Sequence, residues 1–215
     1  MNKNKTIAVV GSVGSVFLSI AWSIFTEPVL AHHPNGGQIP NSFVAGFTSG
    51  LGHPIIGIDH LAFTIAIGLL AASSKKLGIL IPLSFVTATA IGTAIHLQSV
   101  NLPATELIIA ASVLVAGVFL VWKDRASLPL LTVIGAIAGI FHGYAYGESI
   151  VGAEATAVGA YLLGFCGIQL GICAIALFGA RWTISRVDRA FIWLRFAGFA
   201  IFGIGFAFIS NILLG

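Results

Sequence analysis

The sequence predicts an all-α fold, a polytopic membrane helix bundle with six transmembrane helices after an N-terminal signal peptide. Of the 215 residues, 58% are hydrophobic and only 8% are charged, whereas a soluble domain carries about 25% charged residues. The apolar segments are long and continuous, as membrane-spanning helices of roughly 20 residues require. The strands of a membrane barrel would be shorter and would alternate between polar and apolar residues.

Residues 1–31 have the pattern of a signal peptide, and residues 32–215 then form a single transmembrane domain. Lys3 and Lys5 give a basic start, an apolar stretch follows, and Ala31 ends a run that suits a cleavage site. Because the apolar stretch is long for a signal peptide, an uncleaved first helix is the alternative, and it would bring the total to seven.

Six further apolar segments follow, and their connections decide the orientation. They cover residues 42–72, 77–98, 104–122, 128–147, 155–179 and 190–213. The ten Lys and Arg all fall on one side of the predicted bundle, and the positive-inside rule makes that side cytoplasmic. We therefore expect a multi-pass protein of the inner (plasma) membrane whose C-terminus is periplasmic.

The first of these segments is too long for a single span, because one helix of that length would measure about 46 Å against a hydrocarbon core of about 30 Å. Proline disfavours helix at the residue before it and is tolerated at a helix start. We therefore expect the first mature helix to be broken near Gly52-Pro54. Irregular backbone at membrane depth needs protein or a water-filled cavity around it, so the break indicates a site.

Glycines recur at every fourth residue along one stripe of the segment 128–147. They are Gly135, Gly139, Gly143 and Gly147. Small residues at this spacing let helices approach closely, so we expect a tight helix contact beside His142.

Composition and missing motifs exclude several classes of function. The basic residues form no patch, so no nucleic-acid partner is expected despite the net charge of +3. The chain has neither a phosphate-binding G-x-x-x-x-G-K-[ST] loop nor the H-E-x-x-H element of a metalloprotease. Met1 is the only methionine, which leaves a thioether copper path without ligands. We expect neither enzymatic activity nor a resident cofactor; the expected partners are lipid and a divalent metal ion.

Histidines and acids gather toward one face of the predicted membrane. All six histidines lie in its outer half or outside it, as do four of the seven acids. These residues are His32, His33, His53, His60, His96 and His142, with Glu27, Glu106, Glu148 and Glu154. Solubility does not explain the asymmetry, because Lys and Arg would serve it equally well. Imidazole with carboxylate suits Ni²⁺, Co²⁺ and Zn²⁺.

The sharpest local feature is the run from His53 to His60, which also contains Asp59. An acid inside a membrane helix is costly and needs a partner or a function. The two histidines are seven residues apart and share a face if the helix begins near His53. Asp59 would either ligate a cation or orient an imidazole. A structural Asp–His pair that holds the break together is the alternative.

A second feature combines His142 and Tyr146, one helical turn apart, with Glu148 at the helix exit. A hydrogen-bonded core histidine is an equally good interpretation of this pattern. His96 ends a polar stripe on its helix, and Glu106 opens the next helix at the same level, so both are possible path residues together with Tyr146.

The N-terminus offers a third feature. Cleavage after Ala31 would start the mature chain at His32-His33, where a free amine and two imidazoles form a metal-capturing terminus. A disordered polar start is the alternative.

These motifs together resemble the HupE/UreJ family of membrane proteins. That family has a signal peptide ending just before histidine, an H-x5-D-H element in the first mature helix and a later F-H-G-x-A-H-G-x-E element. The matching residues are His53, Asp59 and His60 for the first element, and Phe141, His142, Gly143, Ala145 and Gly147 for the second. Tyr146 stands at the place of the family's second histidine. Ser149 stands at the place of its acid, with Glu148 one residue early.

The resemblance implies a nickel or cobalt permease linked to the metal supply of hydrogenase and urease. We therefore predict that the protein binds Ni²⁺ or Co²⁺ from the periplasmic side and translocates it. Entry ligands would be His32 and His33. The central site would be His53, Asp59, His60 and His142, with Glu148, His96 and Glu106 in support or along the path. The alternatives are a metal-binding accessory or sensor subunit without transport, and a haem-binding protein with His60 and His142 as axial ligands.

Overall fold

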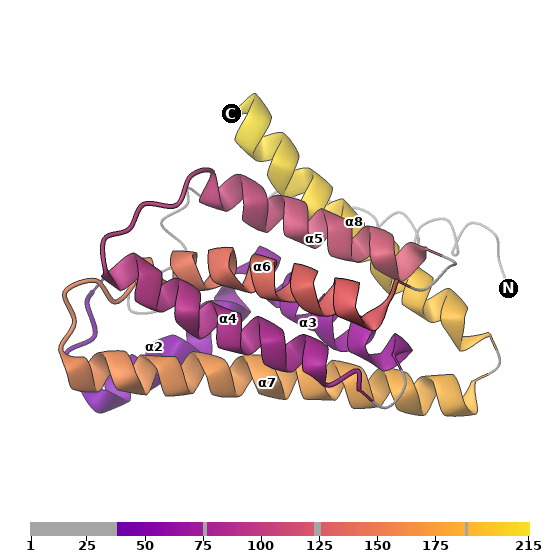
Figure 1. Ribbon diagram of the computed structural model, residues 1–215, viewed down its shortest axis with the longest axis horizontal. Coiled ribbons are helices and arrows are strands. Elements are labelled where there is room, and N and C mark those ends of the chain that lie inside the picture. The colour runs from indigo at the N-terminus through magenta and orange to yellow at the C-terminus, as the bar shows by residue number, and fades with distance from the viewer. Residues whose placement is uncertain (1–37, 75–76, 123–125, 188) are drawn as a thin grey trace, which may run out of the picture. The chain divides into compact units, whose positions relative to one another are not determined.

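Seven helices make up the described part of the chain, and no strand occurs within it (Figure 1). They are α2 (Phe43–Ile56), α3 (Ile58–Ser73), α4 (Leu80–Leu97), α5 (Thr105–Val121), α6 (Leu128–Glu148), α7 (Ala155–Arg186) and α8 (Ala190–Leu214). The computed structural model describes residues 38–74, 77–122, 126–187 and 189–215, all of which belong to one unit of the chain. The predicted signal peptide, residues 1–31, and the predicted entry ligands His32 and His33 lie outside these residues.

The helices have the length and composition of membrane spans. Four of them, α4, α6, α7 and α8, are long and apolar enough to cross a bilayer, and α2 with α3 make a fifth candidate as one bent pair. The apolar helix α5 is shorter, at 17 residues, which is the lower limit for a span. The prediction of an all-α, multi-pass membrane protein is confirmed.

The outward-facing side chains explain why lipid must surround this fold. Large apolar residues such as Ile175, Phe178 and Phe196 are 76%, 60% and 58% exposed. A soluble monomer rarely exposes large contiguous apolar patches. Helix α7 continues to Arg186, past the predicted end at residue 179, because its polar last turns form helix beyond the stretch that hydropathy detects.

The break in the first mature helix is real, but it lies at Gly57 and not near Gly52-Pro54. Helix α2 continues through Pro54 to Ile56, and α3 starts at Ile58 after a bend of 81°. Proline removes only one hydrogen bond from the helix, and here the helix tolerates that loss. Gly57 has extended backbone, with φ −72° and ψ 105°, and a Cβ there would lie 2.6 Å from the ring of His60. The His60 ring therefore packs directly against the backbone at the break.

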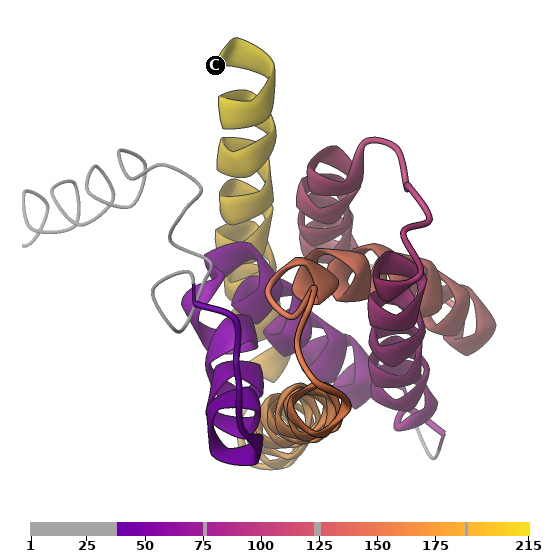
Figure 2. The same ribbon diagram turned by 90° about the vertical axis from the view of Figure 1, so that its left-hand side faces the viewer.

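Helix α3 contacts every other described helix. The remaining helices pair around it, α4 with α6, α5 with α8 and α2 with α7. Figure 2 shows the α2–α7 pair from one end, with α2 in indigo and α7 in orange. Among the described helices, α3 consequently has the most enclosed side chains, and two of the predicted site residues lie at its start.

Glycines permit the closest of these helix contacts, as predicted. A Cβ on Gly139 would lie 2.6 Å from the carbonyl oxygen of Phe85, and one on Gly143 would overlap the carbonyl oxygen of Thr89. Such spacing lets two helix backbones touch directly. Because α6 lies so close to α4, His142, which is next to Gly143, is held in a tightly packed layer.

Candidate metal site

Three of the predicted histidines are buried together. His53 on α2, His60 on α3 and His142 on α6 are 3%, 4% and 0% exposed. The bend at Gly57 sets His53 opposite His60, with 5.9 Å between their ring centroids. Buried imidazoles need hydrogen-bond partners, and the cluster supplies them from four helices.

His60 and His142 bond directly to each other. Their Nδ1 atoms are 2.8 Å apart, and Nε2 of His142 lies 2.9 Å from Oγ of Ser112 on α5. The Ser112 hydroxyl donates to the carbonyl of Ile109 at 2.7 Å, so its oxygen accepts the Nε2–H of His142. Neutral His142 then accepts at Nδ1 from the Nδ1–H of His60. The Nδ1 lone pair of His142, which a cation would need, therefore accepts the Nδ1 proton of His60.

His53 is held on the other side of the cluster. Its Nδ1 lies 2.9 Å from the hydroxyl of Tyr161 on α7 and 3.2 Å from Oγ of Ser149 at the end of α6. Both hydroxyls also donate to the carbonyl of Tyr146 at 3.0 Å. Because both hydroxyl protons point to that carbonyl, the two oxygens are left to accept an Nδ1–H of His53.

Tyr146 lies between the two histidines of the broken helix. Its ring centroid is 4.8 Å from that of His53 and 4.7 Å from that of His60. Its hydroxyl accepts the amide N–H of Gln169 at 3.1 Å, and Oε1 of Gln169 accepts the hydroxyl of Thr89 at 3.0 Å. Tyr146, Gln169 and Thr89 are all fully buried.

Asp59 is only half-buried, and its Oδ1 accepts the backbone N–H of His60 at 2.8 Å. A carboxylate in the first turn of a helix is stabilised by the unpaired N–H groups there. The Asp59 carboxylate thus stabilises the start of α3 and holds the backbone of His60. It lies at the edge of the cluster.

The remaining sequence candidates are placed apart from the buried cluster. Glu148 and Glu106 are exposed. His96 is half-buried in the last turn of α4, next to Tyr144 with 4.4 Å between ring centroids. Among the described residues, no group of three or more His, Cys, Asp or Glu side chains is arranged to hold a metal ion. The cluster in this arrangement combines imidazoles with hydroxyl oxygens.

Three members of the cluster were missed by sequence analysis, namely Ser112, Tyr161 and Gln169. Each is a polar residue in an otherwise apolar segment. A side-chain amide in a membrane helix requires hydrogen-bond partners, so Gln169 was the clearest signal available. The partners themselves lie on other helices, which local sequence patterns do not reveal.

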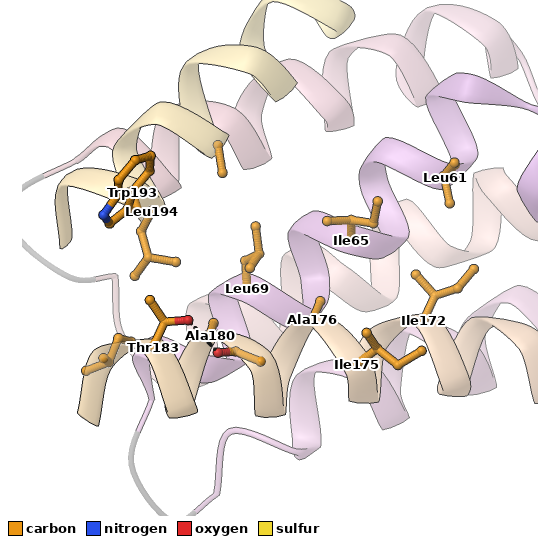
Figure 3. Close-up of a pocket in the computed structure, with 13 residues that line it drawn as sticks. Leu61, Ile65, Leu69, Ile172, Ile175, Ala176, Ala180, Thr183, Trp193 and Leu194 are labelled. Carbon is orange, nitrogen blue, oxygen red and sulfur yellow. Dashed lines mark hydrogen bonds between the residues drawn. The ribbon is translucent and has the colours of Figure 1, made fainter. Parts of the chain in front are cut away.

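A groove of about 530 Å³ lies between α3, α7 and α8 (Figure 3). Its lining is almost entirely apolar, from Leu61 and Ile65 on α3 to Ile172 on α7 and Trp193 on α8, and it includes no His, Asp or Glu. It therefore offers no ligands to a cation, and the histidine cluster remains the candidate site.

Comparison with known proteins agrees with the resemblance of the motifs. A family model described as HupE / UreJ protein matches residues 20–208. The chain belongs to the HupE/UreJ family. It is 28% identical over 150 residues to Protein HupE of Rhizobium leguminosarum bv. viciae, which covers 66% of this chain and 78% of that protein. No solved structure matches the chain.

Two residues of this HupE/UreJ family member depart from the motif expected from the sequence, and they lie close together. Tyr146 and Ser149 stand where the motif described above leads one to expect a histidine and an acid. Both lie in the buried cluster, where the Tyr146 ring and the Ser149 hydroxyl contact His53. Glu148, one residue before Ser149, is exposed. In this structure Ser149, and not the carboxylate of Glu148, contacts His53.

Proposed function

We propose that this protein is a membrane permease that binds Ni²⁺ or Co²⁺ from the periplasmic side and passes it across the membrane. Its family is associated with nickel and cobalt transport. The observation that carries the proposal is the burial of three imidazoles, those of His53, His60 and His142, at a helix break inside a membrane bundle. Imidazole is a good ligand for these ions, and polar groups at membrane depth mark ion pathways.

Cation binding requires only a small movement of the histidine pair. A tetrahedral ion with metal–nitrogen bonds of about 2.0–2.1 Å separates its ligand nitrogens by about 3.3 Å. The Nδ1 atoms of His60 and His142 are 2.8 Å apart. A shift of about half an ångström would admit the ion in place of the shared proton. Transport also demands exchangeable binding, which suits a site whose ligands hydrogen-bond to each other when empty.

The same geometry disfavours the haem-binding alternative. Two axial nitrogens on opposite faces of an iron are about 4 Å apart, and a porphyrin needs a flat slot between them. The ring of Phe63 stacks on His142 at 4.5 Å, and that of Phe85 packs edge-on at 5.9 Å. These contacts fill the space beside the histidine pair.

Uptake into proteoliposomes tests the proposal. Purified protein should accumulate labelled Ni²⁺ or Co²⁺ above empty vesicles, and His60→Ala should abolish uptake while the protein still inserts. Gln98→Ala, which alters an exposed residue at the end of α4, should transport like the wild type. Metal binding without accumulation by folded wild-type protein would instead support an accessory or sensor subunit.

Orientation needs its own experiment. With Cys166 and Cys173 replaced by Ala, single cysteines at the exposed positions Val100 and Ser185 report the two membrane faces. We expect a membrane-impermeant maleimide to label Val100→Cys in cells with a permeabilised outer membrane and Ser185→Cys only after the inner membrane is opened. The reverse pattern would invert the proposed direction of entry.

A further inference from the structure

Gln169 is a fully buried amide in the middle of α7, and both of its ends are bonded. Its Oε1 accepts from the Thr89 hydroxyl of α4 at 3.0 Å, and its Nε2 donates to the Tyr146 hydroxyl of α6 at 3.1 Å. A buried amide without these partners would be strongly disfavoured. The side chain thus ties three helices together at one point.

The residue that Gln169 holds is in contact with two predicted ligands. The Tyr146 ring lies against His53 and His60, whose own centroids are 5.9 Å apart. Its main-chain end is fixed as well, because its carbonyl accepts the hydroxyls of Tyr161 and Ser149. Loss of the hydrogen bond from Gln169 to the Tyr146 hydroxyl would let the Tyr146 ring tilt. The imidazoles of His53 and His60 could then move relative to each other.

We propose that Gln169 is a positioning residue for metal selectivity, which acts by holding Tyr146 between His53 and His60. This inference rests on the proposed function of the site. First-row divalent cations follow a fixed order of affinity for a given set of ligands, so a site discriminates between them by imposed geometry. A Tyr146 ring held firmly between His53 and His60 fixes the separation of the two imidazoles. If the ring is loose, the choice of metal ion depends only on the intrinsic affinity of each ion for imidazole.

The test compares ion affinities in detergent-solubilised protein by calorimetry, with Ni²⁺, Co²⁺ and Zn²⁺ titrated separately. Gln169→Leu removes both hydrogen bonds, and Tyr146→Phe removes only the hydroxyl that Gln169 holds. Loss of a partner that orients a ligand lowers metal affinity about 10–100-fold. Because the released ring would alter the spacing of the imidazoles, each variant should lower the Ni²⁺ and Zn²⁺ affinities unequally and so change their ratio. The double variant should be no worse than either single variant, because both remove the same interaction.

Two further variants separate positioning from general stability. Gln169→Glu, which burial keeps protonated, retains an oxygen acceptor for Thr89 and an O–H donor for the phenol, so it should keep the wild-type ratio. Gln98→Leu makes the same change at an exposed amide and should alter nothing. Without any metal, Gln169→Leu should also shift the tyrosine bands of an ultraviolet difference spectrum against the wild type, in which the four unchanged tryptophans largely cancel.

The outcomes distinguish the two proposals. If Gln169→Leu melts earlier but keeps the wild-type affinity ratio, Gln169 is only a structural tie and the inference is wrong. If Gln169→Leu does not fold, the Tyr146→Phe variant serves as the test. An unchanged ratio of Ni²⁺ to Zn²⁺ affinity in that variant would equally overturn the inference. Additive effects in the double variant would show that Gln169 does not act through Tyr146. Wild-type protein that binds none of the three ions would overturn both this inference and the permease proposal.

Discussion

His60 and His142 lie 82 residues apart in the chain and meet with their Nδ1 atoms 2.8 Å apart. The contact joins the start of α3 to the middle of α6, and it rests on a hydrogen bond from His142 to Ser112 of α5. Three helices therefore determine which nitrogen carries the proton. The predictions below perturb this arrangement one contact at a time.

Ser112→Ala should weaken metal binding without preventing folding. The change leaves the Nε2–H of His142 without its acceptor, at a cost of about 1–3 kcal/mol, and frees the ring to change tautomer. Loss of a partner that orients a ligand lowers metal affinity about 10–100-fold. Calorimetric titration with Ni²⁺ measures the effect. Ser84→Ala is the matched control, because Ser84 also bonds helix carbonyls, those of Ile81 and Thr132. Equal affinities in the two variants would count against the proposed role of Ser112.

Gly57→Ala should displace His60 while the helices remain intact. Its Cβ would lie 2.6 Å from the His60 ring and 3.3 Å from Oδ1 of Asp59, so the ring must move. We expect Ni²⁺ uptake in proteoliposomes to fall at least several-fold, with an unchanged circular dichroism spectrum. Gly167→Ala, where nothing lies within 4 Å of the added atom, should keep full uptake. Normal uptake by Gly57→Ala would mean that the close contact at the break is not needed.

Ser149→Ala should affect transport more than Glu148→Gln. Ser149 is buried, and its hydroxyl lies 3.2 Å from Nδ1 of His53, whereas Glu148 is exposed. Initial uptake rates at several Ni²⁺ concentrations should show a raised KM for Ser149→Ala and wild-type values for Glu148→Gln. The opposite ranking would restore Glu148 as the ligand that its sequence position suggested.

Gly143→Ala should destabilise the bundle directly. The added methyl group would overlap the carbonyl oxygen of Thr89, so α4 and α6 must separate. Overpacking of this kind costs about 1–3 kcal/mol, and the midpoint of thermal unfolding in detergent should fall. Gly159→Ala has open space around it and should hold or raise the midpoint, since alanine favours helix by about 1 kcal/mol over glycine. Similar midpoints for both variants would contradict the tight contact.

Local patterns in the sequence were sufficient for the helices and for part of the site. Apolar run length located the helices, because lipid demands uninterrupted helical hydrogen bonding. The glycine spacing correctly indicated the contact beside His142. Helical periodicity was misleading for His53 and His60, which were expected on one face of one helix. They lie on separate helices and converge because the chain bends at Gly57.

Contacts between distant segments accounted for what the sequence did not predict. Nothing near His142 in the chain indicates that Ser112 and His60 bond to it, since both contacts depend on how α3, α5 and α6 pack. The exposure of Glu148 and the burial of Ser149 likewise follow from where α6 ends.

The shared contact of Tyr146 and Ser149 with His53 has a consequence for how related sequences would diverge. The ring of Tyr146 and the hydroxyl of Ser149 contact the same imidazole of His53, and Tyr161 bonds the Ser149 hydroxyl and the backbone carbonyl of Tyr146. A histidine at position 146 and an acid at position 149 would form a different unit in the same space. Among relatives, the identities of these two positions should therefore change together, as a single inherited trait and not as two independent substitutions.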